Sequence, residues 1–391
     1  MIREDFAVAR RLAELPPYLF VEIDRKKREA AARGVDVINL GIGDPDIPTP
    51  TPIVRALAKA ARVPANHRYP ESEGLDRFRA AVAEWYRGRF GVELSPAKEV
   101  LSLIGAKEGI GHLPLALVNP GDVVLIPDPA YPVYRAGTIF AGGEPYVMPL
   151  RKDNGFLPDL GAIPADVLRR AKLMFINYPN NPTGAVAPLE FFRDVVAFAA
   201  RHHLVVAQDN TYSEIAFDGY KPPSFLEVPG AKEVGIEFHS LSKTFNMTGW
   251  RIGFAVGRAE VIDALRRIKS NLDSGAFQAV QEAGITAFSL ADQISQKNSR
   301  IYQRRRDILV RCLRKVGLAV DSPKATFYVW PQVPPGFDSA SFVSHLIDRA
   351  GIACVPGSGF GKEGEGFVRM ALTADAARLT EATERLATLL G

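Results

Sequence analysis

One lysine of this chain lies in a cluster of hydroxyl groups between two apolar runs. Ser240 and Ser242 precede Lys243, and Arg251 follows eight residues after the lysine. A lysine that forms a Schiff base must lose its proton easily, and partial burial and nearby positive charge both favour this. Hydroxyl groups and a guanidinium are suitable donors for a phosphate. The segment therefore predicts a Schiff-base lysine beside a phosphate seat, although by itself it fits a solvated loop equally well.

Polar residues also follow two of the strands that the sequence predicts. Asn181 lies in a turn, residues 180–184, after the apolar run 173–176, and Asp209 and Tyr212 follow the run 204–207. A carboxylate at the end of a buried strand is costly unless it is paired. A protonated pyridine nitrogen would be a suitable partner for Asp209, and Tyr212 could donate to an oxygen on the same ring. A plain turn and a capping aspartate are the simpler interpretations.

Two further positions fit a planar, phosphorylated ligand. Ala106 and Lys107 follow Gly105 between the apolar run 100–104 and a predicted helix. Small residues at a helix N-terminus form an anion seat. Tyr131 comes after the predicted strand 123–126, where its ring could stack on a planar group. Each signal is weak alone, because strand ends often carry such residues.

The elements that position these residues indicate an α/β fold. Short apolar runs at 123–126, 173–176, 204–207 and 252–256 alternate with helix-length stretches such as 189–202. This alternation predicts a mostly parallel sheet covered by helices, with ligands at the carboxyl ends of the strands.

The two ends of the chain have a different pattern and predict a second, smaller α+β domain. A helix is expected over 18–33 and a strand over 35–40; near the other end, a long helix over about 276–316 precedes further short strands and helices. We predict a large domain over 46–280, and a small domain made of 1–45 and 281–391.

Composition excludes several classes of protein. The 391 residues carry a net charge of only +4, and no stretch resembles a basic arm, which argues against nucleic-acid binding. Cys312 and Cys354 lie far apart without metal-ligand spacing, so we expect no metal site, no disulfide and a reducing cytoplasm. The charged N-terminus lacks a signal-peptide core, and no apolar run is long enough to cross a membrane. A soluble cytoplasmic protein is expected.

Taken together and in this order, the motifs resemble those of the fold-type-I, class I/II aminotransferases, which use pyridoxal 5'-phosphate (PLP). The resemblance spans nearly the whole chain and depends on Asn181-Pro182-Thr183-Gly184, Asp209 with Tyr212, Ser240-Leu241-Ser242-Lys243 with Arg251, and Arg369. It implies a large domain with a mostly parallel seven-stranded sheet and a smaller α+β domain.

The resemblance also implies roles for individual residues. Lys243 would form the Schiff base and shuttle the substrate proton, Asp209 would keep the pyridine nitrogen protonated, and Arg369 would bind the substrate carboxylate. Tyr212 and Asn181 would bond the ring oxygen, and Tyr131 would stack on the ring. The phosphate would be held by Ala106, Lys107, Ser240, Ser242 and Arg251. Ala106 departs from the serine of many relatives, which removes one phosphate hydroxyl.

A narrower resemblance is to the LL-diaminopimelate aminotransferases. It depends on the segments 17–20, 39–45, 105–107 and 271–275. It implies a homodimer that converts LL-2,6-diaminopimelate and 2-oxoglutarate to tetrahydrodipicolinate and glutamate, in lysine biosynthesis. The implied substrate contacts are Tyr18, Gly43, Lys107, Tyr131, Asn181, Asn271 and Arg369. Tyr69 is expected to reach the cofactor phosphate in the partner subunit. The sequence does not identify a residue that recognises the distal amino group of diaminopimelate.

Three alternatives differ in class. A nicotinamide dehydrogenase fingerprint at Gly41-Ile42-Gly43 fails, because Asp46 occupies the third glycine position and prolines follow. Another PLP reaction, such as β-elimination or decarboxylation, or an aminotransferase for aspartate, alanine or aromatic amino acids, uses the same lysine, aspartate and arginine. A non-enzymatic regulator with this fold usually carries an added DNA-binding segment, which this N-terminus does not resemble.

Overall fold

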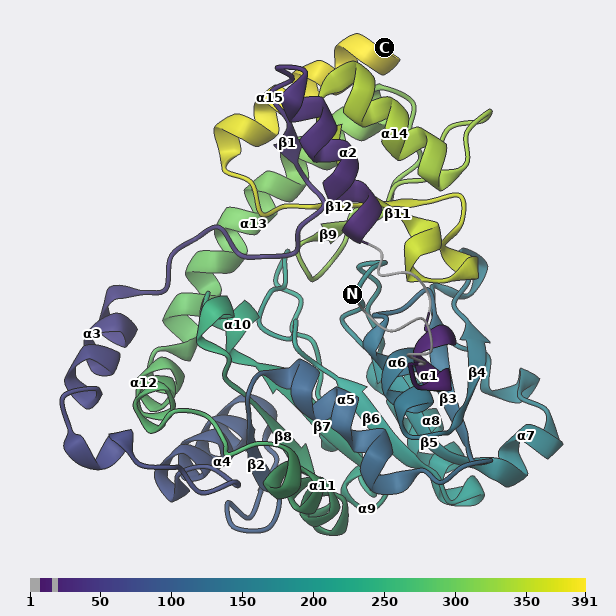
Figure 1. Ribbon diagram of the computed structural model, residues 1–391. Helices are drawn as coiled ribbons and strands as arrows, with labels where there is room; N and C mark the ends of the chain where they lie inside the picture. The colour runs from purple at the N-terminus through teal and green to yellow at the C-terminus, as the bar shows by residue number, and fades with distance from the viewer. Residues whose placement is uncertain (1–7, 16–19) are drawn as a thin grey trace.

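The computed structural model describes residues 8–15 and 20–391 of the chain. Figure 1 shows a large part, in which helices cover a central sheet, and a smaller part of helices and short strands above it. This is the α/β architecture that the sequence predicts.

The central sheet has seven strands, and only one of them runs against the others. In order across the sheet they are β2 Val100–Leu103, β8 Gly253–Gly257, β7 Gly235–Ser240, β6 Val205–Asp209, β5 Ala171–Asn177, β3 Val123–Asp128 and β4 Glu144–Pro149. β8 is antiparallel to both of its neighbours, and the other adjacent pairs are parallel. The prediction of a mostly parallel, seven-stranded sheet is confirmed.

The strands read as continuous apolar runs because both faces of the sheet are buried. In β5, Leu173 and Phe175 pack into one core, while Met174 and Ile176 pack into the core on the other face. The first core is closed by α5 Ala106–Leu117, α6 Val133–Phe140 and α11 Ala259–Leu272. The second is closed by α3 Thr51–Ala60, α4 Asp76–Phe90, α8 Leu189–His202 and α12 Gln278–Ser289. The short helices α7 Ala165–Arg170 and α9 Ala231–Val234 lie between strands.

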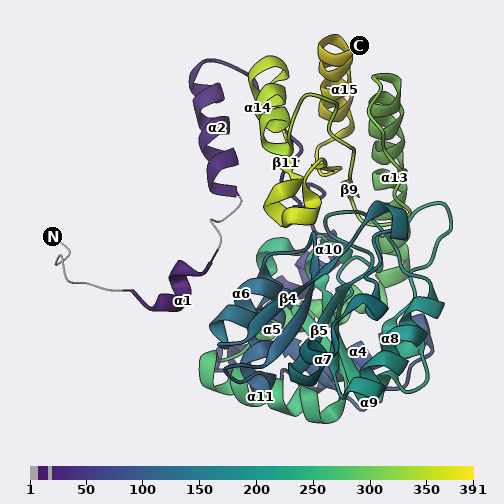
Figure 2. The ribbon, with the colours of Figure 1, turned by 90° about the vertical axis from the view of Figure 1, so that its right-hand side faces the viewer.

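The smaller part combines both ends of the chain. β1 Ile38–Asn39 pairs in parallel with β10 Ile352–Ala353, and β12 Val368–Ala371 lies between β11 Val355–Pro356 and β9 Tyr328–Val329 in an antiparallel sheet. The helices α2 Phe20–Ala32, α14 Ser339–Ala350, α15 Ala376–Leu390 and α13 Ala291–Lys315 stand side by side above the central sheet (Figure 2). The four-residue helix α1, Arg10–Ala13, buries none of its residues.

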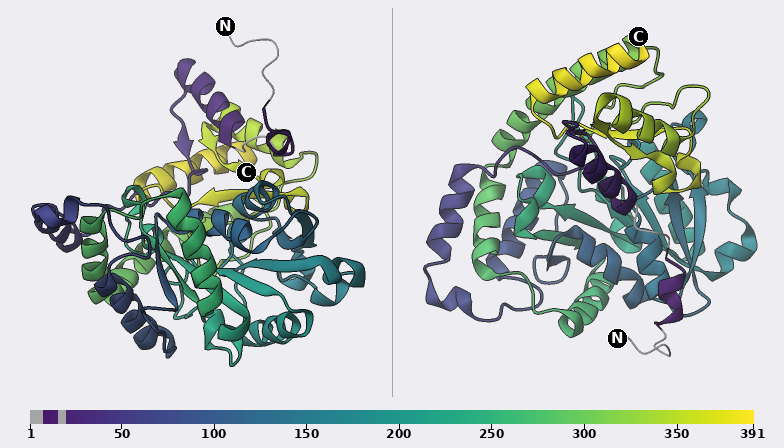
Figure 3. Two further views of the ribbon diagram at one scale, coloured as in Figure 1. Left: turned by 60° about the horizontal axis from the view of Figure 1, so that its bottom comes forward. Right: turned by 45° about the horizontal axis from the view of Figure 1, so that its top comes forward.

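The long helix expected over about 276–316 is two helices, α12 and α13, with Leu290 between them. The break lets α12 pack against α3 and α4 in the large part while α13 runs up into the smaller part (Figure 3). Apolar periodicity continues through this point, so the sequence pattern did not reveal the bend. The expected boundary after residue 280 falls inside α12, whose buried Ala283, Ala287 and Phe288 belong to a core of the large part. We therefore propose a boundary within α13.

Among the described residues, no helix combines the length and apolar character needed to cross a membrane.

Candidate active site

The candidate site lies at the carboxyl edge of the central sheet, below the smaller part. β5, β6 and β7 are parallel neighbours, so the residues that follow them meet at one edge. Asn181 follows β5, Asp209 ends β6, and Lys243 lies in the short helix α10, Leu241–Thr244, directly after β7. These residues come from distant parts of the sequence, and the sheet brings them together.

Lys243 is partly buried, and Asp44 and Asp209 are the acidic groups that act on it. Its Nζ donates a hydrogen bond of 2.8 Å to the backbone oxygen of Gly43. Burial lowers the pKa of Lys243 to about 8, and the charges of Arg251 and Arg369 act in the same direction against Asp44. A substantial fraction of the amine is therefore neutral near physiological pH, as a nucleophile or proton acceptor requires.

Asp209 is a buried carboxylate that receives hydrogen bonds from two directions. The hydroxyl of Tyr134 donates to Oδ2 at 2.8 Å, and the backbone N–H of Thr211 donates to Oδ1 at 3.3 Å. Burial raises the pKa of Asp209, and the bonds from Tyr134 and Thr211 partly offset this. A buried carboxylate of this kind is stabilised by a cationic partner in the cavity.

A candidate anion seat lies on the same side of the sheet, where α5 begins. The helix starts at Ala106, and its N-terminal N–H groups have no partners within the helix. The guanidinium of Arg251 packs against Gly105, where a Cβ atom would overlap it; Gly105 also has a φ of 78°. Arg251 donates to the backbone oxygen of Thr248 at 3.0 Å, and the Ser240 hydroxyl accepts from the Ser242 N–H at 3.2 Å. The loss of a hydroxyl at Ala106 leaves these other donors in place.

Arg369 is a buried cation that faces this seat from the smaller part. It is 3% exposed and donates to Asn181 Oδ1 and to the backbone oxygen of Gly41, both at 2.8 Å. Its Nε has no hydrogen-bond partner, and within residues 8–15 and 20–391 no carboxylate lies at ion-pair distance from it. A substrate carboxylate would satisfy both deficits.

One cavity of about 240 Å³ collects most of the residues that the sequence singled out. Those that line it are Gly43, Ala106, Lys107, Tyr131, Asn181, Asp209, Tyr212, Ser240, Ser242, Lys243, Arg251 and Arg369. The sequence did not single out Ile110, Pro132, Thr211, Thr248, Tyr328 and Phe360, which also line it. Tyr328 lies in an apolar segment of the smaller part, where nothing in the local pattern distinguishes it from a core residue, and Phe360 lies in the glycine-rich segment 357–361.

Three expected contacts are not part of this cavity in the single chain. Tyr69 is 86% exposed, and the exposed side chain of Asn271 donates to the backbone oxygen of Arg267 at 2.8 Å. Their segments are neighbours, because Gln278 donates to the backbone oxygen of Arg68 at 3.2 Å. Tyr18 lies outside the described residues.

The segment that carries Gly43 is anchored by a partly buried ion pair. Both Nη atoms of Arg305, in α13, donate to the carboxylate of Asp46 at 2.7 Å. This pair holds residues 41–46 over the cavity and supports the carbonyl that Lys243 bonds. Asp46, which excludes a dinucleotide fingerprint, thus has a structural function.

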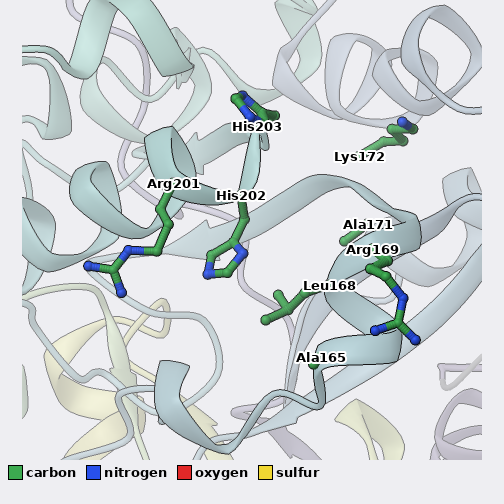
Figure 4. A pocket seen from close by; sticks show the side chains of 8 residues that line it. All are labelled: Ala165, Leu168, Arg169, Ala171, Lys172, Arg201, His202 and His203. Atoms are coloured by element: carbon green, nitrogen blue, oxygen red, sulfur yellow. The ribbon is translucent and has the colours of Figure 1, made fainter.

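A larger cavity, of about 460 Å³, lies at the opposite, amino-terminal edge of the sheet. It is lined by basic residues that precede β5 and β6 or begin them, namely Arg169, Lys172, Arg201, His202 and His203. Figure 4 shows Arg169, Lys172 and Arg201 extending in different directions rather than converging on one point. Cavity size is therefore a poor guide to the chemistry of this chain.

Glu108, His112 and Asp273 form a second cluster, between α5 and α11, with ligand atoms close enough to hold a metal ion. The buried ammonium of Lys269 already lies among them, 3.3 Å from Glu108 and 2.7 Å from Asp273. This ammonium supplies the positive charge that the carboxylates need.

Comparison with known proteins agrees with this geometry. Residues 35–386 match the family described as aminotransferase class I and II. The chain belongs to this family. An LL-diaminopimelate aminotransferase of Moorella thermoacetica is 60% identical over 383 residues, 98% of each chain, and one of Aquifex aeolicus is 56% identical over 384 residues, 98% of this chain and 99% of that one.

Two solved structures superpose closely on this one. Substrate-bound BacF from Bacillus subtilis has a TM-score of 0.94 at 39% identity, with 98% of each chain covered. A probable N-succinyldiaminopimelate aminotransferase from Thermus thermophilus has a TM-score of 0.90 at 40% identity and covers 95% of this chain and 100% of its own. The protein is an aminotransferase, as its sequence predicts.

Proposed function

We propose that this aminotransferase uses PLP to transfer the amino group of LL-2,6-diaminopimelate to 2-oxoglutarate. The observation that carries the reaction is the cavity shared by the partly buried Lys243, by Asp209 and by Arg369, whose Nε has no hydrogen-bond partner. The substrate is supported by the names of relatives that are 53–60% identical over nearly the whole chain.

The residues around the cavity fit the cofactor in charge and shape. Asp209 would face the pyridine nitrogen, because its carboxylate is buried and receives donors on the side of Tyr134 and Thr211. Tyr212 and Asn181 would bond the ring oxygen, and Tyr131 would cover a face of the ring. The anion seat at Ala106, Lys107, Ser240, Ser242 and Arg251 would hold the phosphate. When bound, PLP supplies an aldehyde for the lysine and an electron-withdrawing ring.

The side chains of this chain would perform the remaining work. Arg369 would hold the α-carboxylate and so orient the α-carbon toward Lys243. The neutral amine of Lys243 would accept the proton of the substrate α-carbon and return it to the C4′ atom of the cofactor. Burial by the smaller part would exclude water and strengthen these charge interactions.

We also propose a homodimer in which each subunit completes the site of the other. Tyr69, Leu272 and Phe277 are large apolar residues that are 86%, 56% and 42% exposed on neighbouring segments. Exposed apolar residues that gather in this way are typical of protein interfaces. Tyr69 would reach the partner's phosphate, and Asn271 and Tyr18 would lie near the substrate, together with Gly43 and Lys107. A cytoplasmic location suits a biosynthetic enzyme of this kind.

Absorbance spectroscopy tests the reaction directly. Protein saturated with PLP should absorb near the edge of the visible range, lose that band with an amino donor, and regain it with a 2-oxo acid. Borohydride should trap the cofactor on Lys243, and a trapped adduct elsewhere, or none, would refute the proposal. LL-diaminopimelate, aspartate, alanine and aromatic donors should then be compared with 2-oxoglutarate. A faster reaction with another donor would refute the substrate alone, and release of free ammonia without 2-oxoglutarate and without formation of glutamate would indicate β-elimination.

Tyr134→Phe tests the proposed partnership of Asp209. The change removes the hydroxyl that donates to Asp209 at 2.8 Å but keeps the ring stacked on Phe175. A hydrogen bond to a charged group contributes about 1.5–3 kcal/mol, so we expect cofactor affinity to fall at least about tenfold. Fluorescence titration with PLP measures this. Tyr178→Phe is the control, because it removes a buried hydroxyl that donates to the backbone oxygen of Phe156 and not to Asp209. This variant should bind PLP as tightly as the unmodified protein does. Equal losses of PLP affinity in both variants would contradict the assignment.

A further inference from the structure

Tyr328 enters the active-site cavity from β9, in the smaller part of the chain. β9 pairs with β12, where Tyr328 lies opposite Ala371, two residues after Arg369. Because side chains alternate along a strand, Tyr328, Ala371 and Arg369 share one face of this sheet. The pairing of β9 with β12 thus brings a tyrosine beside the arginine that is expected to bind substrate.

The ring of Tyr328 supports the guanidinium of Arg369. The guanidinium carbon lies 4.2 Å from the centroid of the Tyr328 ring and 4.7 Å from that of Phe360. Stacking on an aromatic face is favourable for a guanidinium and also defines its plane. The hydrogen bonds to Asn181 and Gly41 hold the two Nη atoms, and the ring contacts hold the plane.

The hydroxyl of Tyr328 has a different partner. It lies 3.0 Å from the hydroxyl of Tyr212, and both side chains are buried. The backbone of Gly43 closes the other side, since a Cβ atom built there would overlap the Tyr328 hydroxyl. Each hydroxyl has one proton, so a bond donated by Tyr328 leaves the Tyr212 proton free for a ligand. A bond in the opposite direction would leave the Tyr328 proton facing Gly43 without an acceptor.

We propose that Tyr328 is a positioning residue for two groups of the site, the hydroxyl of Tyr212 and the guanidinium of Arg369. This inference rests on the proposed function. Its hydroxyl donates to Tyr212, which directs the Tyr212 proton toward the ring oxygen of PLP. Its ring fixes the plane of Arg369 for the substrate carboxylate. The charged groups that act on Tyr212 are Arg369 from β12 and Asp209 from β6. The same two groups act on Lys243 in α10, together with Asp44 and Arg251.

Tyr328→Phe tests the hydroxyl alone. The ring remains under Arg369, so KM for the amino donor should stay within about twofold. Without the Tyr328 hydroxyl, Tyr212 is a weaker hydrogen-bond donor to the ring oxygen of PLP, and the anionic form of that oxygen is less stable. The pKa of the nitrogen that joins PLP to Lys243 is therefore higher. The pH at which the absorbance of the PLP-loaded protein changes should therefore rise by about 0.5–1 pH unit, the size expected for one neutral hydrogen bond.

A second substitution at Tyr212 separates this effect from general damage. Tyr212→Phe should also raise the transition pH, and adding Tyr328→Phe to it should cause no further rise, because the hydroxyl of Tyr328 acts through that of Tyr212. Tyr220→Phe is the matched control, since its half-buried hydroxyl bonds Ala187 away from the cavity, and it should leave the titration unchanged. Additive shifts, or none with Tyr328→Phe, would overturn the hydroxyl's role.

Tyr328→Leu tests the ring. We expect KM, and the dissociation constant of a non-reactive dicarboxylate measured by calorimetry, to rise about tenfold, while kcat changes by less than about threefold. Tyr328→Phe should restore the affinity because it restores the ring; failure to do so would overturn the stacking role. If the unmodified protein binds PLP without an absorbance transition assigned to Lys243, the proposed function fails instead. If that transition exists and the Tyr328 variants do not alter it or the affinity, only this inference fails.

Discussion

Replacing Lys243 with alanine is expected to lower kcat at least about 10³-fold. The amine would act both as the attachment point of the cofactor and as the group that moves the α-proton, and positioned acid–base catalysis alone contributes about 10²–10⁴-fold. Lys243 projects from α10 toward Gly43 at the carboxyl edge of the central sheet, whereas Lys107, which also lines the cavity, belongs to the anion seat at the start of α5. Single-turnover mixing of PLP-loaded variant with an amino donor measures the loss.

Cofactor binding provides the internal control for this variant. Asp209 and the anion seat at the start of α5 are unchanged in Lys243→Ala, so PLP should still bind, although more weakly. Lys172→Ala is the matched lysine substitution, since Lys172 lies in the basic cavity at the amino-terminal edge of the sheet. It should keep full activity. Turnover of Lys243→Ala within tenfold of the unmodified protein would remove the central assignment.

Arg369→Ala is expected to lower the stabilisation of the transition state by about 2–5 kcal/mol. The loss is measured as a fall in kcat/KM for the amino donor. The arginine is 3% exposed, so the substrate carboxylate would lose a desolvated partner rather than a solvated one. The variant also leaves Asn181 Oδ1 and the oxygen of Gly41 without their donor. KM should rise more than kcat falls, because the interaction exists before the reaction begins.

Arg369→Lys distinguishes charge from geometry. Lysine keeps the positive charge but cannot present two parallel donors or lie flat on the ring of Tyr328, so we expect an intermediate kcat/KM. Thermal unfolding of each variant checks that the fold persists. If Arg369→Ala leaves KM unchanged in a protein that remains folded, another residue binds the carboxylate.

Much of the candidate site could be predicted because its chemistry is encoded in short segments. Lys243 with its neighbouring serines, and Asn181 before Pro182, are each recognisable within about ten residues. Arg369 required the resemblance, because a single arginine in a short strand has no local signature. Tyr134 and Tyr328 were not found, since an aromatic residue in an apolar run looks like core until its hydroxyl is seen to meet Asp209 or Tyr212.

The sequence by itself determined the α/β class, the bounds of α8, and the residue types available to the site. Local patterns suffice for these, since strand and helix periodicities depend on neighbouring residues. The reversal of β8, the bend at Leu290 and the meeting of Arg369 with Asn181 were decided by the tertiary structure. So was the lowered pKa of Lys243, which falls to about 8 because burial disfavours the charged amine and because Arg251 and Arg369 add positive charge. Burial and long-range charge depend on what the folded chain brings together, and no local pattern contains that information.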